Sequence, residues 1–192
     1  PIRDIETIET ELLIRDIASV EKRIEKLEKG ARIGDKKSLR ELSVLNYIYP
    51  EMNNGVLVQN ILLDANQKDY LNILSLLTNK PILYVLNIDE HQINTYERTP
   101  EIQELINFST KRGNKTILLS GKIESEISTL NEREIDYYLK EYKISEPGLT
   151  KLIHAAYTLL NLNTFFTAGE KEVRAWTIKN GMSAPQAAGE IH

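Results

Sequence analysis

The sequence predicts an α/β fold with a helical hairpin at its start and a β-hairpin at its end. Two apolar runs of strand length, 82–86 and 116–119, are separated by a helical pattern over 100–111. Strand, helix and strand in this order are typical of a three-layer α/β domain with a parallel sheet. Such strands are usually buried on both faces. Helical periodicity precedes this region, and two alternating, β-rich runs follow it.

The first segment predicts a long amphipathic helix. Its apolar residues are spaced three and four apart from Ile5 through Ile8 to Leu12. The seam then continues one position out of step, through Leu13, Ile17, Val20, Ile24 and Leu27. A seam with such a local register shift is typical of a coiled coil with an inserted residue.

A second helix is expected to pack against the first as an antiparallel hairpin. The break at 30–35 contains Gly34, which suits a tight turn, and Asp35, which can cap a helix over 36–53. Pro50 should kink or end that helix near Tyr49. The simplest interpretation of the two seams is mutual burial.

The turn end of this hairpin is basic. Between positions 20 and 40, eight basic residues face four acidic ones, a net charge of +4 in a chain of −4. A solvated helix face with charge pairs explains the pattern, and so does a surface that contacts a nucleic-acid backbone. The candidate RNA contacts are Lys22, Arg23, Lys26, Lys29, Arg32, Lys36, Lys37 and Arg40.

Local signals place further elements. Asn66 can cap a helix that contains Tyr70 to Leu77, and helical stretches are expected over 124–130, 132–142 and 146–160. A hairpin pairs 164–168 with 172–178 across the turn 169–171, and Ser183 can cap a final short helix. The predicted domains are 1–65, a helical coiled coil; 66–162, an α/β domain; and 163–192, the start of a second small domain.

Composition excludes several classes of function. The 192 residues are 41% hydrophobic and 27% charged, and none is cysteine, which excludes disulfides, thiol catalysis and cysteine-bound zinc. That composition fits a reducing, cytoplasmic location, and no apolar run suits a membrane span. Both ends of the chain suggest a segment of a longer product. The three histidines, His91, His154 and His192, suggest no metal site.

Polar tetrapeptides follow both apolar strands. Asn87, Ile88 and Glu90 come after the first strand, and Ser120, Gly121 and Lys122 come after the second. Ligands of α/β sheets bind at the carboxyl ends of the strands. An amide can donate to and accept from a base edge, a carboxylate accepts from an N–H, and Ser-Gly lets the backbone come close. The two segments together therefore predict a site for a nucleotide base.

These two segments resemble the last two motifs of the P-loop GTPase superfamily, N-K-x-D and S-A-K. Here Ile88 replaces the lysine and Glu90 the aspartate, which is similar to the Obg-like ATPases of the YchF group. The opening twelve residues, the coiled coil and 80–87 resemble the same group. The strings 164–169 and 173–177 resemble the start of its TGS domain.

The resemblance implies a partial P-loop NTPase domain, Rossmann-like, with an inserted coiled coil and the start of a ubiquitin-like β-grasp TGS domain. It also implies binding and hydrolysis of ATP, with GTP as an alternative, in the presence of Mg²⁺, and association with the ribosome. Asn87, Glu90 and the backbone of Ile88 would contact the base, and Ser120, Gly121 and Lys122 would flank it. The glutamate implies a preference for adenine.

The phosphate-binding half of such a site is not found in these 192 residues. A phosphate loop reads G-x-x-x-x-G-K-[ST] between a strand and a helix, and neither Gly113-Asn114-Lys115-Thr116 nor Gly121-Lys122 fits it. No catalytic residue is therefore assigned, and we expect this segment alone not to hydrolyse a nucleotide. The alternative function is a non-catalytic module that binds ribosomal RNA through the basic turn.

Overall fold

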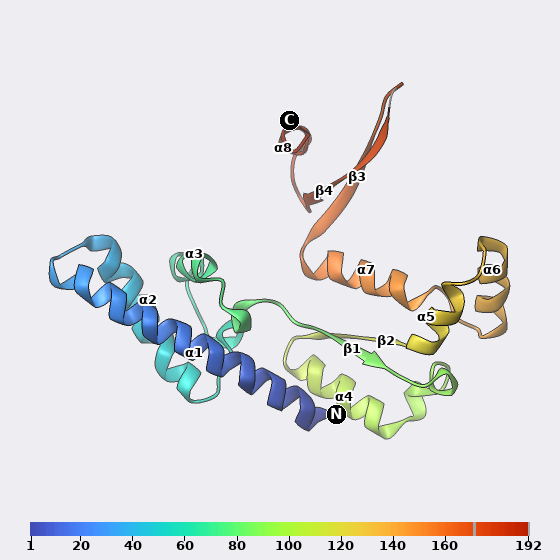
Figure 1. Ribbon diagram of the computed structural model, residues 1–192, viewed down its shortest axis with the longest axis horizontal. Coiled ribbons are helices and arrows are strands. Elements are labelled where there is room, and N and C mark those ends of the chain that lie inside the picture. The colour runs from blue at the N-terminus through green and yellow to red at the C-terminus, as the bar shows by residue number, and fades with distance from the viewer. Residues whose placement is uncertain (171, 192) are drawn as a thin grey trace. The chain divides into compact units, whose positions relative to one another are not determined.

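The computed structural model describes residues 1–170 and 172–191, so Lys171 in the predicted hairpin turn and His192 lie outside the described residues (Figure 1). The chain divides into two compact units, Pro1–Pro81 and Ile82–His192. This division neither confirms nor contradicts the predicted domain boundaries. Among the described residues, no helix is long and apolar enough to cross a bilayer.

The first unit is built on two long helices. Helix α1 spans Ile2–Arg32 and α2 spans Lys36–Asn53, and the two pack against each other. Asp35 caps α2 as predicted, and Gly34 has φ +80°, a conformation that glycine adopts without strain. The predicted bounds 36–53 are confirmed, but the helix does not end near Tyr49. Pro50 lies in the last turn of α2 and lacks the N–H that would bond to the carbonyl of residue 46.

The seam between the helices is partly polar, which the apolar spacing did not indicate. Ile8 is 58% exposed, whereas Glu9 and Asp16 of α1 and Glu41 of α2 are buried. Glu41 accepts from Nε and Nη2 of Arg23 at 2.7 and 2.8 Å, which raises the pKa of Arg23. Two of these buried acids, Asp16 and Glu41, accept hydrogen bonds from other elements.

Short elements complete the first unit: η1 (Val58–Asn60), α3 (Ala65–Leu74) and η2 (Leu77–Asn79). Asp64 caps α3, not Asn66. Its side chain accepts from the Gln67 backbone while the Gln67 side chain accepts from the Asp64 backbone, a capping box that pairs the N-cap residue with a glutamine three residues later. Buried Asp16 accepts from the backbone N–H groups of Leu77 and Thr78 at 2.9 and 2.7 Å and ties η2 to α1.

The second unit begins with the predicted strand–helix–strand unit. Strands β1 (Leu83–Asn87) and β2 (Lys115–Leu119) are parallel, and α4 (Pro100–Lys111) connects them. Helices α4 and α7 (Gly148–Leu159) cover opposite faces of the two strands (Figure 1). The expected burial of β1 on both faces is wrong, since Val85 is 44% exposed in this two-stranded sheet.

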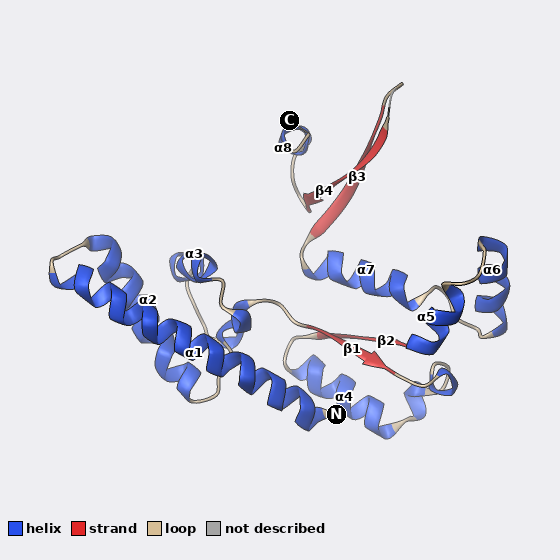
Figure 2. Cartoon of the chain, in the orientation of Figure 1, coloured by secondary structure: helices blue, strands red, loops and turns tan. Residues whose placement is uncertain are grey.

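The remaining elements of the second unit follow the sequence closely (Figure 2). Helix α5 spans Gly121–Ile127 and α6 spans Glu132–Glu141. Strands β3 (Leu162–Ala168) and β4 (Val173–Lys179) form the predicted antiparallel hairpin. Ser183 caps α8 (Ala184–Gly189) in a capping box, as expected. The mixed α/β class that the sequence predicts is confirmed.

Candidate nucleotide-base site

The two polar segments predicted from the sequence lie side by side at the carboxyl edge of the sheet. Asn87 is paired with Leu119 in the parallel register, and the Ile88 backbone N–H donates to the Leu119 carbonyl at 2.9 Å. Parallel pairing brings the ends of β1 and β2 to the same edge. The segments that follow each strand are therefore neighbours, although 34 residues separate Asn87 from Gly121.

Asn87 joins these segments directly. Its Oδ1 accepts from the Gly121 backbone N–H at 2.8 Å, and its side chain is exposed. A Cβ on Gly121 would lie 3.4 Å from that oxygen, so a side chain there would crowd the contact. Because Oδ1 is engaged, the Nδ2 amino group of Asn87 remains to donate to a ligand.

The second segment is the start of a helix. The predicted helix began at Glu124, but α5 begins at Gly121 with Ser120 as its N-cap residue. Only the first backbone N–H groups of a helix lack intrahelical acceptors, which explains why the Gly121 N–H can donate to Asn87. Ser120 is 1% exposed, so its side chain is packed inside the unit, whereas Gly121 and Lys122 are exposed.

Glu90 is held by its backbone and by a cation. It begins η3 (Glu90–Gln92), where the side chains of Asp89 and Gln92 form a capping box. Its carboxylate Oε1 accepts from Lys122 Nζ at 2.8 Å, and its side chain is 15% exposed. This hydrogen bond raises the pKa of Lys122, so Lys122 stays protonated at neutral pH. The sequence placed both residues at the site but did not indicate their contact.

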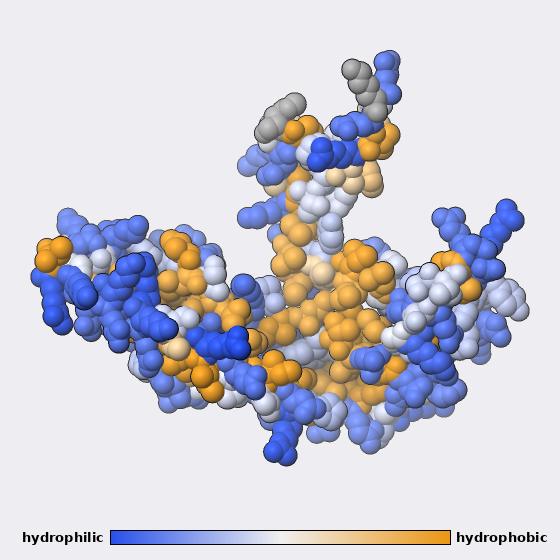
Figure 3. Space-filling view, viewed as in Figure 1, coloured by the Kyte–Doolittle hydropathy of each residue, from blue (hydrophilic) through white to orange (hydrophobic). Residues whose placement is uncertain are grey.

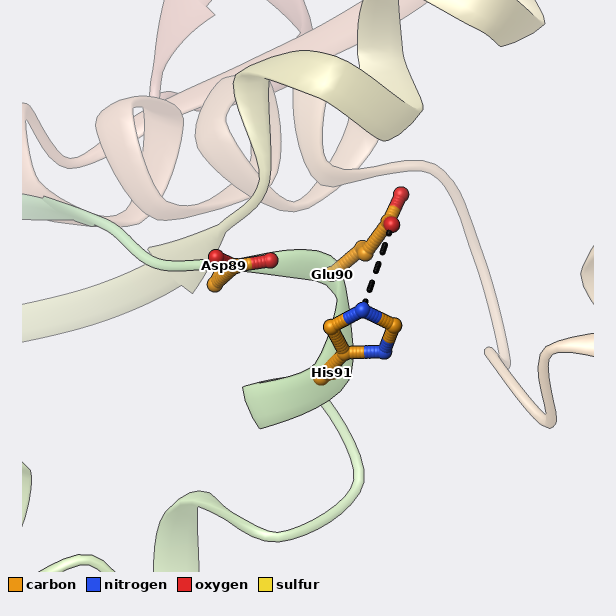
Figure 4. Close-up of side chains that lie close together, drawn as sticks. All are labelled: Asp89, Glu90 and His91. Atoms are coloured by element: carbon orange, nitrogen blue, oxygen red, sulfur yellow. Dashed lines mark ion pairs between the residues drawn. The ribbon is translucent and has the colours of Figure 1, made fainter.

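His91 also lies beside Glu90. Its Nε2 is 3.5 Å from Glu90 Oε1, and Asp89, Glu90 and His91 offer three possible ligand atoms within 4.8 Å of one another (Figure 4). A cation could be held there only in competition with the Lys122 ammonium. The site thus contains the ion pair between Glu90 and Lys122. The expectation that the histidines form no metal site stays a prediction.

A cavity of about 340 Å³ lies on the α7 side of the sheet and does not coincide with the predicted base site. It is lined by residues of β2, α5 and α7 and of the segments before α4 and before α7, among them Tyr96, Leu119, Glu124 and Lys151. None of the six residues predicted to contact or flank the base is among its lining. The predicted base-contacting residues therefore do not line this cavity.

Glu124 is a residue whose role the sequence did not reveal. Its Oε1 accepts from the Gly148 backbone N–H at 2.6 Å and its Oε2 from Leu149 at 3.0 Å. A carboxylate at a helix N-terminus satisfies N–H groups that lack intrahelical acceptors. Glu124 thereby connects α5, which begins at the site, to α7. No local signal identifies it, because the contact spans 24 residues.

The basic turn belongs to the first unit. Seven of its eight predicted cations are exposed, and the visible face of the turn end is mainly hydrophilic (Figure 3). Arg23 is the exception, because Glu41 holds its guanidinium in the bidentate pair between α1 and α2. The exposed set is Lys22, Lys26, Lys29, Arg32, Lys36, Lys37 and Arg40.

Comparison with known proteins gives consistent matches. The family model YchF-GTPase_C, described as "Protein of unknown function (DUF933)", matches residues 162–192. The "Ribosome-binding ATPase YchF" proteins of Escherichia coli O157:H7 and Bacillus subtilis strain 168 are each 40% identical to the chain over 192 residues, which is 100% of this chain and 52% of theirs. The chain thus spans about half the length of these relatives.

A solved structure agrees with the sequence matches. The "Structure of the Schizosaccharomyces pombe YchF GTPase" superposes with a TM-score of 0.85 at 32% identity, covering 100% of this chain and 52% of that one. A partial P-loop NTPase domain with a coiled coil and the start of a TGS domain is consistent with this match. The predicted resemblance is confirmed: over its whole length, the chain is homologous to about half of a YchF protein.

Proposed function

We propose that this chain is the base-reading part of a ribosome-associated, Obg-like ATPase that binds ATP, and GTP as an alternative, with Mg²⁺. The names of its relatives support ATP hydrolysis and ribosome binding, and a ribosome partner fits a cytoplasmic location. We propose the boundaries 1–65 for the coiled coil, 66–162 for the part of the G domain and 163–192 for the start of the TGS domain.

One observation carries the proposal most directly: the hydrogen bond from Gly121 to Asn87 joins the two predicted base-contacting segments. It turns the Asn87 amide into a donor beside a strand edge, where it can reach a purine nitrogen. Glu90 supplies a carboxylate acceptor nearby on η3, suited to the exocyclic amine of adenine. The Ile88 backbone would complete the proposed contacts. Ser120, Gly121 and Lys122 would flank the base, with the Ser120 side chain packed inside the unit.

The sequence contains no phosphate-loop motif, and no magnesium ligand is assigned to its residues. Neither glycine-lysine string is a phosphate loop, so this chain supplies donors and acceptors for the base alone. Catalysis of phosphoryl transfer depends mainly on positioning and on charge stabilisation around the phosphates. We therefore assign recognition, and no chemical step, to the residues of this chain.

Nuclear magnetic resonance titration with AMP tests the base site. We expect the AMP-induced amide shifts to concentrate at 87–90 and 121–122. We also expect Asn87→Ala and Glu90→Ala each to weaken AMP binding by roughly tenfold. That is the effect of losing one hydrogen bond with a charged or well-placed partner. Asn107→Ala and Glu104→Ala replace exposed residues of the same types on α4 and should leave binding unchanged. Unchanged AMP affinity in both site variants would refute the assignment.

We further propose that the basic turn contacts ribosomal RNA, because seven cations are exposed on one helical hairpin. Phosphate contacts release counterions, so affinity should fall as salt rises. Charge reversal of Lys26, Lys29 and Lys36 to Glu should weaken binding to a ribosomal RNA fragment and flatten the salt dependence. The matched control reverses Lys111, Lys115 and Lys140, which are exposed in the second unit. Equal losses in both triple variants would exclude a specific role of the turn.

A further inference from the structure

We propose that Lys122 sets the base preference of the site by holding one oxygen of the Glu90 carboxylate, so that Glu90 presents a single acceptor oxygen to a base. A single acceptor suits the lone exocyclic amine of adenine. It does not suit guanine, which offers two adjacent N–H donors. The inference rests on the proposed base site and assigns Lys122 as its specificity-determining residue.

The contacts of Glu90 are unequal between its two oxygens. Lys122 Nζ lies 2.8 Å from Oε1, and His91 Nε2 lies 3.5 Å from the same atom. Among the described residues, both cations beside Glu90 make their closest approach to Oε1 and not to Oε2. In Figure 4 the oxygen that carries no dashed line points away from His91. One oxygen of the carboxylate is therefore occupied, and we assign the other, Oε2, to the base.

The position of Glu90 is fixed, so the difference in contacts between Oε1 and Oε2 is maintained. The capping box of Asp89 and Gln92 holds the turn on which Glu90 lies, with the Asp89 backbone N–H donating to Gln92 Oε1 at 3.0 Å. Lys122 lies in the first turn of α5, whose preceding strand is paired in register with β1. Both partners of the ion pair are thus mounted on elements joined at the sheet edge, and a charge-assisted hydrogen bond holds them.

The contact proposed for Asn87 cannot discriminate between purines. The Asn87 amino group is a donor, and both adenine and guanine present N7 as an acceptor. Discrimination must come from a group that meets the edges where the two bases differ. Adenine has an exocyclic amine beside a ring acceptor, whereas guanine has a ring N–H beside an exocyclic amine. A carboxylate with both oxygens open accepts from both guanine donors at once, and Lys122 prevents that arrangement.

Lys122 also supplies a donor of its own. An ammonium group has three N–H donors, and the Glu90 contact uses one of them. A donor beside an acceptor complements the ring nitrogen and amine of adenine together. The ion pair as a whole therefore presents a pattern that a lone carboxylate does not.

The test measures AMP and GMP affinities of the chain by amide-shift titration in three variants. Lys122→Met removes the cation from Oε1 of Glu90, so that both carboxylate oxygens can accept from guanine. We expect the ratio of GMP to AMP affinity to rise about tenfold, the value of one charge-assisted hydrogen bond. Lys122→Arg brings a planar fork that can occupy both oxygens, and we expect AMP binding to weaken about fivefold or more. Lys140→Met, which removes an exposed lysine of α6, should change neither affinity.

The outcomes separate this inference from the proposed function. If Lys122→Met leaves the affinity ratio unchanged while the unmodified chain still binds AMP at 87–90, the role of Lys122 is refuted and the base site stands. If the unmodified chain shows no AMP-induced shifts at 87–90 or 121–122, the proposed function itself fails. A fold check by amide spectra distinguishes either outcome from loss of structure, since Glu90 and Lys122 lie at the edge of the sheet and not in its interior.

Discussion

At the scale of single residues, Gly148 is a position where the backbone packs too closely for any side chain. A Cβ built there would lie 2.7 Å from the Cβ of Leu119 and 2.8 Å from Oε1 of Glu124. The same Glu124 oxygen accepts from the Gly148 N–H, so relief by moving Glu124 would break the link between α5 and α7. We expect Gly148→Ala to lower the free energy of unfolding by about 1–3 kcal/mol, measured by urea denaturation.

Gly189 provides the control for this substitution. It ends α8, and a Cβ there would meet no atom within 4 Å. Gly189→Ala should change stability by less than about 0.5 kcal/mol. Equal stability of the two alanine variants would show that α7 moves freely against β2 and that the close approach at Gly148 has no energetic consequence.

At the scale of elements, the start of α2 depends on the charge of Asp35. Its carboxylate accepts from the Ser38 hydroxyl at 2.5 Å and from the Ser38 and Lys37 backbone N–H groups at 3.0 and 3.4 Å. These bonds lower the pKa of Asp35, so the carboxylate is charged in the folded helix at pH values where the unfolded chain begins to bind a proton. The cap therefore stabilises α2 above about pH 3.9, the ordinary value for aspartate.

The stabilisation should be lost as the pH falls through the lowered pKa of Asp35. We expect hydrogen exchange of the first-turn amides of α2 to accelerate relative to the intrinsic rate in that range. Asp35→Asn keeps a capping side chain without a titrating group, so its exchange should lack this pH dependence. Identical profiles for the two proteins would show that the first turn is held by contacts other than the cap.

Elements with local signals were predicted well, because their causes lie within a few residues. The caps at Asp35 and Ser183 and the strand–helix–strand unit follow from such signals. Asp64 was missed in favour of Asn66, since both residue types cap helices and only the reciprocal bond with Gln67 decides between them. The reach of α2 past Pro50 depends on how close the proline lies to the helix end.

The candidate site, too, was predicted only as far as local signals and chain order reach. Chain order alone brings Asn87 and Gly121 to one edge, because consecutive parallel strands end on the same side. The ion pair of Glu90 with Lys122 spans 32 residues and depends on side-chain directions in η3 and α5, which periodicity does not encode. Buried Glu9, Asp16 and Glu41 were missed for a related reason, since their burial depends on partners supplied by other elements or other turns.

At the scale of the whole molecule, the first compact unit ends at Pro81, beyond the proposed coiled-coil boundary at 65. The segment between these positions contains Leu71, Leu76 and Thr78, which are all buried. Thr78 donates its hydroxyl to Asp16 Oδ2 at 2.6 Å and accepts from the Val58 N–H at 3.4 Å. A chain that stops at 65 therefore loses both apolar burial and the donors that satisfy a buried carboxylate of α1.

Two truncated chains, 1–81 and 1–65, test whether this segment belongs to the coiled-coil unit. We expect 1–81 to unfold cooperatively by circular dichroism and 1–65 to melt at least about 10 °C lower, because a loss of 1 kcal/mol shifts the midpoint of a domain this small by roughly 4–8 °C. The substitution Asp16→Asn should reduce the difference in melting temperature between the two chains, because it destabilises 1–81 more than 1–65. An uncharged amide costs less than a carboxylate when its donors are absent, as they are in 1–65. Equal melting temperatures of the two chains would place 66–81 with the α/β unit and support a boundary at 65.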